Sequence, residues 1–191
     1  METNNNSRYL SRRSFLAKSS AFLLTLAVAG PKALALSPQT WADGMELAIN
    51  FKVLNPSSGR GKRPYVAVWI EDSNGNEVKT LVLWMRKRKS KYLKHLSRWF
   101  RKMKDNNADF IFSLSNPTKS PGDYKVVWDG KDDKGKLLPQ GEYYICVESS
   151  RENGPYQLVR EKVSLADQAF SKVFKGEKEL GDVQVEFRQQ L

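Results

Sequence analysis

The sequence predicts an all-β fold, an immunoglobulin-like antiparallel β-sandwich of about seven strands into which one amphipathic helix is inserted. Three observations lead to this prediction. Short segments alternate apolar and polar residues, Asn, Gly and Pro separate these segments, and only one segment has a helical period. A parallel α/β sheet is disfavoured, because it needs a crossover helix between successive strands.

Three strands are expected in the first half of the folded part, at residues 45–54, 64–73 and 77–85. The dipeptide Asn74-Gly75, between the second and the third, is the strongest short signal for a β-hairpin. These segments therefore predict a three-stranded meander. Four further strands are expected at residues 123–128, 142–149, 156–165 and 182–188.

The polar stretch 129–141 raises the question of an ion site, because it holds three aspartates: Asp129, Asp132 and Asp133. A calcium loop starting at Asp129 needs an oxygen ligand at its third position and a glutamate at its twelfth, where this chain has Lys131 and Gln140. The glycine and lysine spacing of a phosphate loop is also absent. We expect a turn instead, in which Asp side chains accept hydrogen bonds from backbone amides and Gly adopts positive φ.

The first 35 residues have the pattern of a twin-arginine (Tat) export signal. Arg12 and Arg13 precede an uncharged run at 19–30, and Ala33-Leu34-Ala35 forms a small-x-small cleavage site. The uncharged run is shorter than the about 20 residues of a membrane-spanning helix. We expect recognition by the Tat translocation machinery, export to the periplasm and cleavage, with an uncleaved N-terminal anchor as the alternative.

The remaining chain is long enough for one domain with a hydrophobic core, and too short for two ordinary ones. Without the signal it keeps 27 basic and 20 acidic residues. The predicted organisation is a signal at 1–35, a linker at 36–43, and a sandwich domain at 44–191 with a basic helical insertion at 87–104.

The single helical pattern lies at residues 90–103. Its apolar stripe recurs at intervals of three and four residues: Tyr92, Leu96, Trp99 and Met103. Basic residues lie mostly on the rest of the helix surface: Lys91, Lys94, Arg98, Arg101 and Lys102. The segment 86–104 has ten Lys or Arg residues and no acid, whereas the rest of the chain after the signal has a small acidic excess.

This basic segment has two interpretations. In the functional one, its five listed cations bind an anionic partner: the lipid head groups of the membrane, an acidic protein of an envelope complex, or a polyanion. In the other, the helix caps one end of the sandwich, Trp99 and Phe100 anchor it in the core, and its outer face is merely solvated. Nucleic acid is a poor candidate partner for an exported protein.

Few residues are available for catalysis. His95 is the only histidine and Cys146 the only cysteine, so two-histidine metal motifs, Cys-x-x-Cys and an intrachain disulfide are all excluded. No nucleophile motif accompanies His95. We expect His95 to be an ordinary helix residue and Cys146 a buried, inert thiol on a strand. The sequence therefore predicts a protein that is not an enzyme and has no metal or resident cofactor.

Longer motifs resemble known families. The segment "WDGKDDKGKLLPQGEYYICVE" is similar to one in bacterial immunoglobulin-like modules, such as that of the flagellar hook-capping protein. Residues 44–188, through "PYVAVWIEDSNGNEVKTLVLW", "KYLKHLSRWFR" and the preceding Tat signal, resemble a family of predicted periplasmic proteins catalogued as a domain of unknown function. That resemblance implies a secreted β-sandwich linked to redox or iron-related membrane systems.

Many members of that family have a threonine segment similar to the motif where flavin transferases attach FMN. Thr118 occupies the matching position, but Asn116-Pro117 replaces the small pair that precedes the threonine in the family pattern. A proline next to the acceptor restricts the backbone that a transferase binds. The main expectation is thus a non-enzymatic binding or accessory protein of the envelope. The alternative is an electron-transfer protein with covalent FMN at Thr118.

Overall fold

The computed structural model describes residues 39–55, 62–86, 90–106 and 108–190. The predicted export signal with Arg12 and Arg13, residues 36–38 of the predicted linker, and the basic residues at 87–89 lie outside these ranges. Within the described ranges, no helix is long and apolar enough to cross a membrane.

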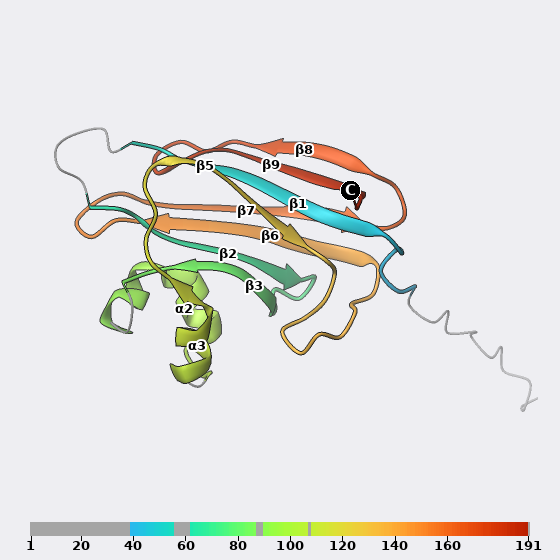
Figure 1. Ribbon diagram of the computed structural model, residues 1–191, viewed down its shortest axis with the longest axis horizontal. Helices are drawn as coiled ribbons and strands as arrows, with labels where there is room; N and C mark the ends of the chain where they lie inside the picture. The colour runs from blue at the N-terminus through green and yellow to red at the C-terminus, as the bar shows by residue number, and fades with distance from the viewer. Residues whose placement is uncertain (1–38, 56–61, 87–89, 107, 191) are drawn as a thin grey trace, which may run out of the picture. The chain divides into compact units, whose positions relative to one another are not determined.

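The fold is a sandwich of two sheets (Figure 1). The four-stranded sheet has the order β5-β1-β9-β8, from strands Gly122–Trp128, Met45–Val53, Leu180–Gln189 and Phe170–Phe174. The five-stranded sheet has the order β4-β3-β2-β6-β7, from strands Ser115–Asn116, Glu77–Trp84, Tyr65–Asp72, Gly141–Ser150 and Tyr156–Leu165. All pairings are antiparallel except that of β3 with the two-residue β4. The predicted antiparallel sandwich is therefore confirmed, with β4 and β8 added to the seven expected strands.

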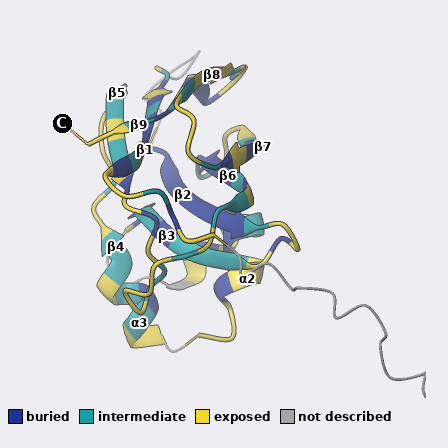
Figure 2. Cartoon of the chain, turned by 90° about the vertical axis from the view of Figure 1, so that its right-hand side faces the viewer, coloured by how far each residue is buried: buried dark blue, intermediate teal, exposed yellow. Residues whose placement is uncertain are grey.

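Strand β2 is buried on both faces (Figure 2), which explains why its sequence is an almost continuous apolar run. Val66, Val68 and Ile70 point into the sandwich core, between the two sheets. Ala67 and Trp69 alternate with them and belong to a second core on the other side of the sheet. A third layer must therefore cover the outer face of the five-stranded sheet.

That third layer is the helical insertion, which consists of the 3₁₀-helix η1 (Ser90–His95) and the helix α2 (Ser97–Met103), followed by α3 (Ala108–Leu114). The prediction of a continuous helix at 90–103 is wrong. Leu96 interrupts it with φ −89° and ψ 69°, outside the α-helical region. The insertion covers the outer face of β2, β3 and β6. The second interpretation of the basic segment had placed it at one end of the sandwich.

Helix α3 lies between the predicted helix and the predicted strand at 123–128, in a segment for which no helix was expected. Ile111 is buried, and Phe110 and Leu114 pack partly against the second core. Their spacing is that of one helical face, so a signal was present in a segment too short to stand out.

A buried ion pair joins the two sheets at one end of the sandwich. Arg151, which follows β6, donates to the Glu179 carboxylate beside β9, and both side chains are almost fully buried. The same guanidinium donates to the backbone carbonyls of Lys62 (2.6 Å) and Leu54 (2.9 Å). Arg151 thus satisfies the carbonyls of two chain segments where no strand is available to pair with them.

Candidate functional site

The cations of the helical insertion differ in how they are placed. Lys91, Lys94, Arg101 and Lys102 are exposed, whereas Arg98 turns inward and is partly buried. Lys102 also donates through Nζ to the carbonyl of Gly75. Four of the five predicted partner-binding side chains are therefore exposed, and both Arg98 and Lys102 have a partner within the fold.

The apolar side of the insertion is fixed on the sheet. Leu96, Trp99 and Met103 are fully buried against β2, β3 and β6. The Trp99 indole donates through Nε1 to the Thr80 hydroxyl, at 3.0 Å. Because these side chains are enclosed, Trp99 belongs to the core and is not exposed to act as a membrane anchor; Phe100 is only half-buried.

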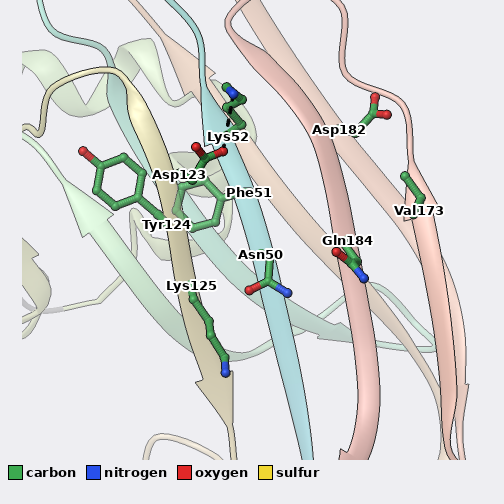
Figure 3. Close-up of a pocket in the computed structure, with 9 residues that line it drawn as sticks. All are labelled: Asn50, Phe51, Lys52, Asp123, Tyr124, Lys125, Val173, Asp182 and Gln184. Atoms are coloured by element: carbon green, nitrogen blue, oxygen red, sulfur yellow. Dashed lines mark ion pairs between the residues drawn. The ribbon is translucent and has the colours of Figure 1, made fainter.

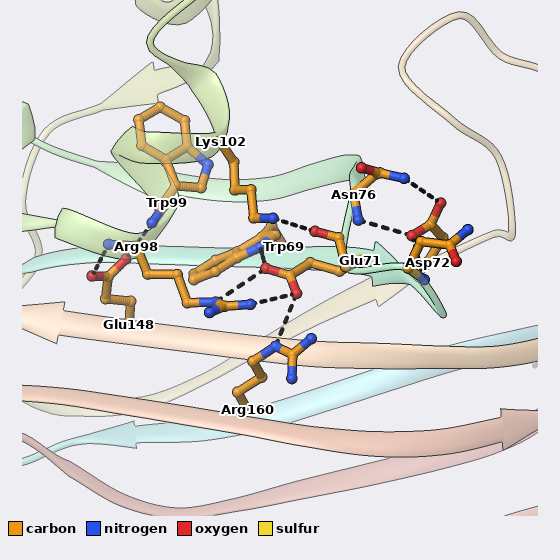
Figure 4. Close-up of polar contacts among 11 residues, drawn as sticks. Trp69, Glu71, Asp72, Asn76, Arg98, Trp99, Lys102, Glu148 and Arg160 are labelled. Atoms are coloured by element: carbon orange, nitrogen blue, oxygen red, sulfur yellow. Dashed lines mark hydrogen bonds and ion pairs between the residues drawn. The ribbon is translucent and has the colours of Figure 1, made fainter.

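Arg98 reaches a carboxylate buried beneath the insertion (Figure 4). Glu71 on β2 has no exposed surface and accepts hydrogen bonds from Arg98 (2.9 and 3.2 Å), Arg160 (2.9 Å) and the Trp69 indole (3.1 Å). Burial alone raises the pKa of Glu71, but the hydrogen bonds from Arg98, Arg160 and Trp69 outweigh it and hold the pKa below its ordinary value. This carboxylate is charged, and it holds α2 to β2 and β7.

A second buried carboxylate caps the start of α2. Glu148 on β6 accepts the backbone amides of Arg98 and Trp99, both at 2.9 Å (Figure 4). Burial raises the pKa of Glu148, and the two amide hydrogen bonds oppose that rise. Leu96, at the N-cap position, offers no side-chain oxygen, so the cap comes from a strand that is distant in sequence. Together, Glu71 and Glu148 fix the orientation of the insertion.

Thr118 lies in a pocket of about 270 Å³ next to the insertion. The pocket, here called the Thr118 pocket, is lined by Lys62, Arg63, Tyr65, Arg86, Thr118 and Glu152. Arg63 donates to the Thr118 carbonyl at 3.4 Å, and Lys62 pairs with Glu152 at 2.6 Å. Three cations against one carboxylate leave an excess of positive charge around Thr118.

Stacked rings join this pocket to the insertion. Tyr65 stacks on both Tyr92 and His95 of η1, with ring centroids 5.6 Å apart in each case. The Arg86 guanidinium lies 6.0 Å from the centre of the Tyr92 ring. His95 is thus a half-buried residue that stacks on two tyrosine rings.

The stretch between β5 and β6 is the predicted turn. Asp132 Oδ1 accepts the amides of Lys134 (2.8 Å) and Lys136 (2.9 Å), and Gly130 and Gly135 have φ of 77° and 79°. The Tyr143 hydroxyl donates to the Pro139 carbonyl at 2.6 Å. Across the described part of the chain, no three His, Cys, Asp or Glu side chains are arranged to hold a metal ion.

Two other features of the fold lack the character of a functional site. A hollow of about 360 Å³ lies on the outer face of the four-stranded sheet (Figure 3), but its two lysines, Lys52 and Lys125, are balanced by Asp123 and Asp182. Cys146 is buried beneath the insertion, as predicted, and burial raises the pKa of its thiol. Neither feature has the charge or the reactivity of a site.

Two groups of residues were not predicted from the sequence: the buried carboxylates Glu71 and Glu148, and the pocket cations Arg63 and Arg86. The carboxylates had a signal, since each directly follows an apolar run within its strand. The pocket had none, because its cations come from segments that meet only in the folded chain.

A β-sandwich with a basic helical layer on one sheet is the class of protein that these observations define. Residues 46–182 match the family described as predicted periplasmic protein (DUF2271), and the chain belongs to that family. No curated protein matches the sequence. Among solved structures, truncated FlgD from Helicobacter pylori (strain 26695) is similar at 17% identity, covering 80% of this chain and 92% of that chain, with a TM-score of 0.31.

Proposed function

We propose that this protein is an exported, non-enzymatic accessory module of the cell envelope that docks on an anionic surface through its helical insertion. One observation carries the proposal: Lys91, Lys94, Arg101 and Lys102 are exposed on η1 and α2, a segment that contains no acidic residue and that buried contacts hold in one orientation. Because the backbone of the insertion is already fixed, only side-chain freedom is lost on binding, which favours association.

Anionic lipid head groups are the partner that this surface fits best. Its apolar residues Leu96, Trp99 and Met103 face the sheet, so binding depends on charge and requires no insertion into the hydrocarbon. Each cation near an anionic membrane contributes about 1 kcal/mol, and salt screens the attraction. The twin-arginine pattern at Arg12 and Arg13 supports delivery to the periplasm by the Tat pathway.

Vesicle co-sedimentation tests this function. The protein without residues 1–35 is expected to sediment with vesicles that contain anionic lipid and to dissociate from them on addition of about 0.5 M salt. It is not expected to sediment with vesicles of neutral lipid. Equal sedimentation with both kinds of vesicle, or none with either, would contradict the proposal. Capture by envelope proteins with no binding to lipid would replace the membrane with an acidic protein partner.

The Thr118 pocket supports a second candidate, a flavoprotein with FMN attached at Thr118. Lys62, Arg63 and Arg86 suit the charge of a phosphate ester there, and Thr118 is half-buried at the pocket wall. The Asn116-Pro117 pair remains a departure from the acceptor pattern. A bound flavin supplies one- and two-electron transfer, which is the basis for a link to redox or iron-related systems.

Intact mass decides this candidate. Co-expression with a flavin transferase is expected to add the mass of one FMN group to the wild-type chain and nothing to the Thr118→Val variant. A wild-type chain of unmodified mass, produced beside a transferase that modifies a known acceptor, rules the candidate out.

A further inference from the structure

A third pocket, of about 430 Å³, lies where three parts of the chain meet. It is lined by Glu77 and Val78 at the start of β3, by Met103, Asn106 and Phe110 around α2 and α3, and by Asp132, Asp133, Lys134 and Leu138 of the loop between β5 and β6. Any change at its wall therefore acts on both the insertion and that loop.

Glu77 connects the wall of this pocket to the insertion. Its carboxylate accepts a hydrogen bond from the Thr80 hydroxyl at 2.8 Å, and that same hydroxyl accepts from the Trp99 indole at 3.0 Å. Thr80 and Trp99 are both buried. A relay of two hydrogen bonds thus leads from Glu77 to the side chain that anchors α2.

The charges around Glu77 disfavour its ionised form. Asp133 faces it from the loop and Glu71 from β2, while Lys79 directs its ammonium to Asp133 (3.3 Å) and to the Asp132 carbonyl (3.1 Å). Asp132 and Lys134 line the same pocket with opposite charges. Burial, which is the largest cause, and the two facing carboxylates raise the pKa of Glu77 to about 7, against the lowering effect of Thr80 and Lys79.

We propose that Glu77 is a proton-operated latch between β3, the helical insertion and the loop at 129–139. When the carboxyl is neutral, the insertion and the loop close over it. When it is ionised, repulsion from Asp133 and the need of a carboxylate for water open the pocket, and the insertion loosens. The latch responds to proton concentration in the envelope, whatever the partner of the insertion is.

Amide hydrogen exchange as a function of pH tests the proposed latch. After correction for the intrinsic rate, the local opening constant of α2 and of the loop is expected to rise about tenfold between about pH 6 and pH 8, for a pKa of 4.5 in the open form and about 7 in the closed form. Glu77→Gln removes this dependence. Glu161→Gln, at an exposed glutamate on β7, keeps it.

Two outcomes would overturn the latch. One is a pH dependence in Glu77→Gln that equals the wild-type dependence; the other is a carbon-13 resonance of the wild-type Glu77 carboxyl that titrates near its ordinary value. The resonance needs no variant, so a misfolded Glu77→Gln does not spoil the test. Asp133→Asn is expected to shift the midpoint of the resonance to lower pH, and an unchanged midpoint would also count against the proposal.

Discussion

The substitution Glu77→Gln is expected to change how the free energy of unfolding depends on pH. The folded-state pKa of about 7 lies above the unfolded value of 4.5, so the unfolded chain releases its proton first as pH rises. The stability that neutral Glu77 contributes is therefore complete below about pH 4.5 and lost by about pH 7. At about 1.4 kcal/mol for each pKa unit, the loss is about 3 kcal/mol.

Urea unfolding followed by circular dichroism measures this effect from about pH 4 to pH 8. Glutamine keeps the shape and the hydrogen bond from Thr80 but cannot ionise, so the variant is expected to gain about 3 kcal/mol relative to wild type across that range. Other shifted groups, such as Glu148 and Glu179, titrate equally in both proteins and cancel in the difference. A difference that stays constant with pH would refute the reasoning. Glu161→Gln serves as the exposed control.

Three further predictions concern contacts around the insertion and the turn. Arg98→Ala removes two of the four hydrogen bonds to the buried Glu71 carboxylate and is expected to cost about 2 kcal/mol in the free energy of urea unfolding; an unchanged value would contradict that role. Gly130→Ala places a Cβ against the Trp41 ring at φ +77° and is expected to lower the melting temperature by several degrees, so equal melting would refute the close packing. Cys146 is expected to react with a thiol reagent only on unfolding, and fast labelling of the native protein would contradict its burial.

The fold could be predicted because its main signals are local. Alternation in β1 and β6, the Asn74-Gly75 hairpin and the turn at 129–141 each act over a few residues. The break at Leu96 could not be predicted, because it depends on a distant residue. Glu148, on a strand about fifty residues further along the chain, caps the start of α2 there. Strand β8 was missed because only its two phenylalanines are partly buried and the residues between them are exposed.

The candidate site was only partly predictable, for a similar reason. A basic helix is visible in sequence, but which of its cations turn inward depends on the sheet below. Arg98 has the same spacing relative to the apolar stripe as an outward cation, yet the charge of Glu71 draws it under the insertion. The pocket around Thr118 depends on segments 62–65 and 86, which are distant from that residue along the chain.

Vesicle binding by two charge-reversal variants tests the central claim most directly. The first variant replaces three exposed cations of the insertion by Glu: Lys91, Lys94 and Arg101. The second replaces three exposed lysines of β5, the turn and β8 by Glu: Lys125, Lys136 and Lys172. Both carry the same net charge, so the account predicts that only the first loses binding to anionic vesicles, by about a hundredfold at roughly 1 kcal/mol for each cation removed. Equal loss in both variants, or binding retained by the first, would contradict it.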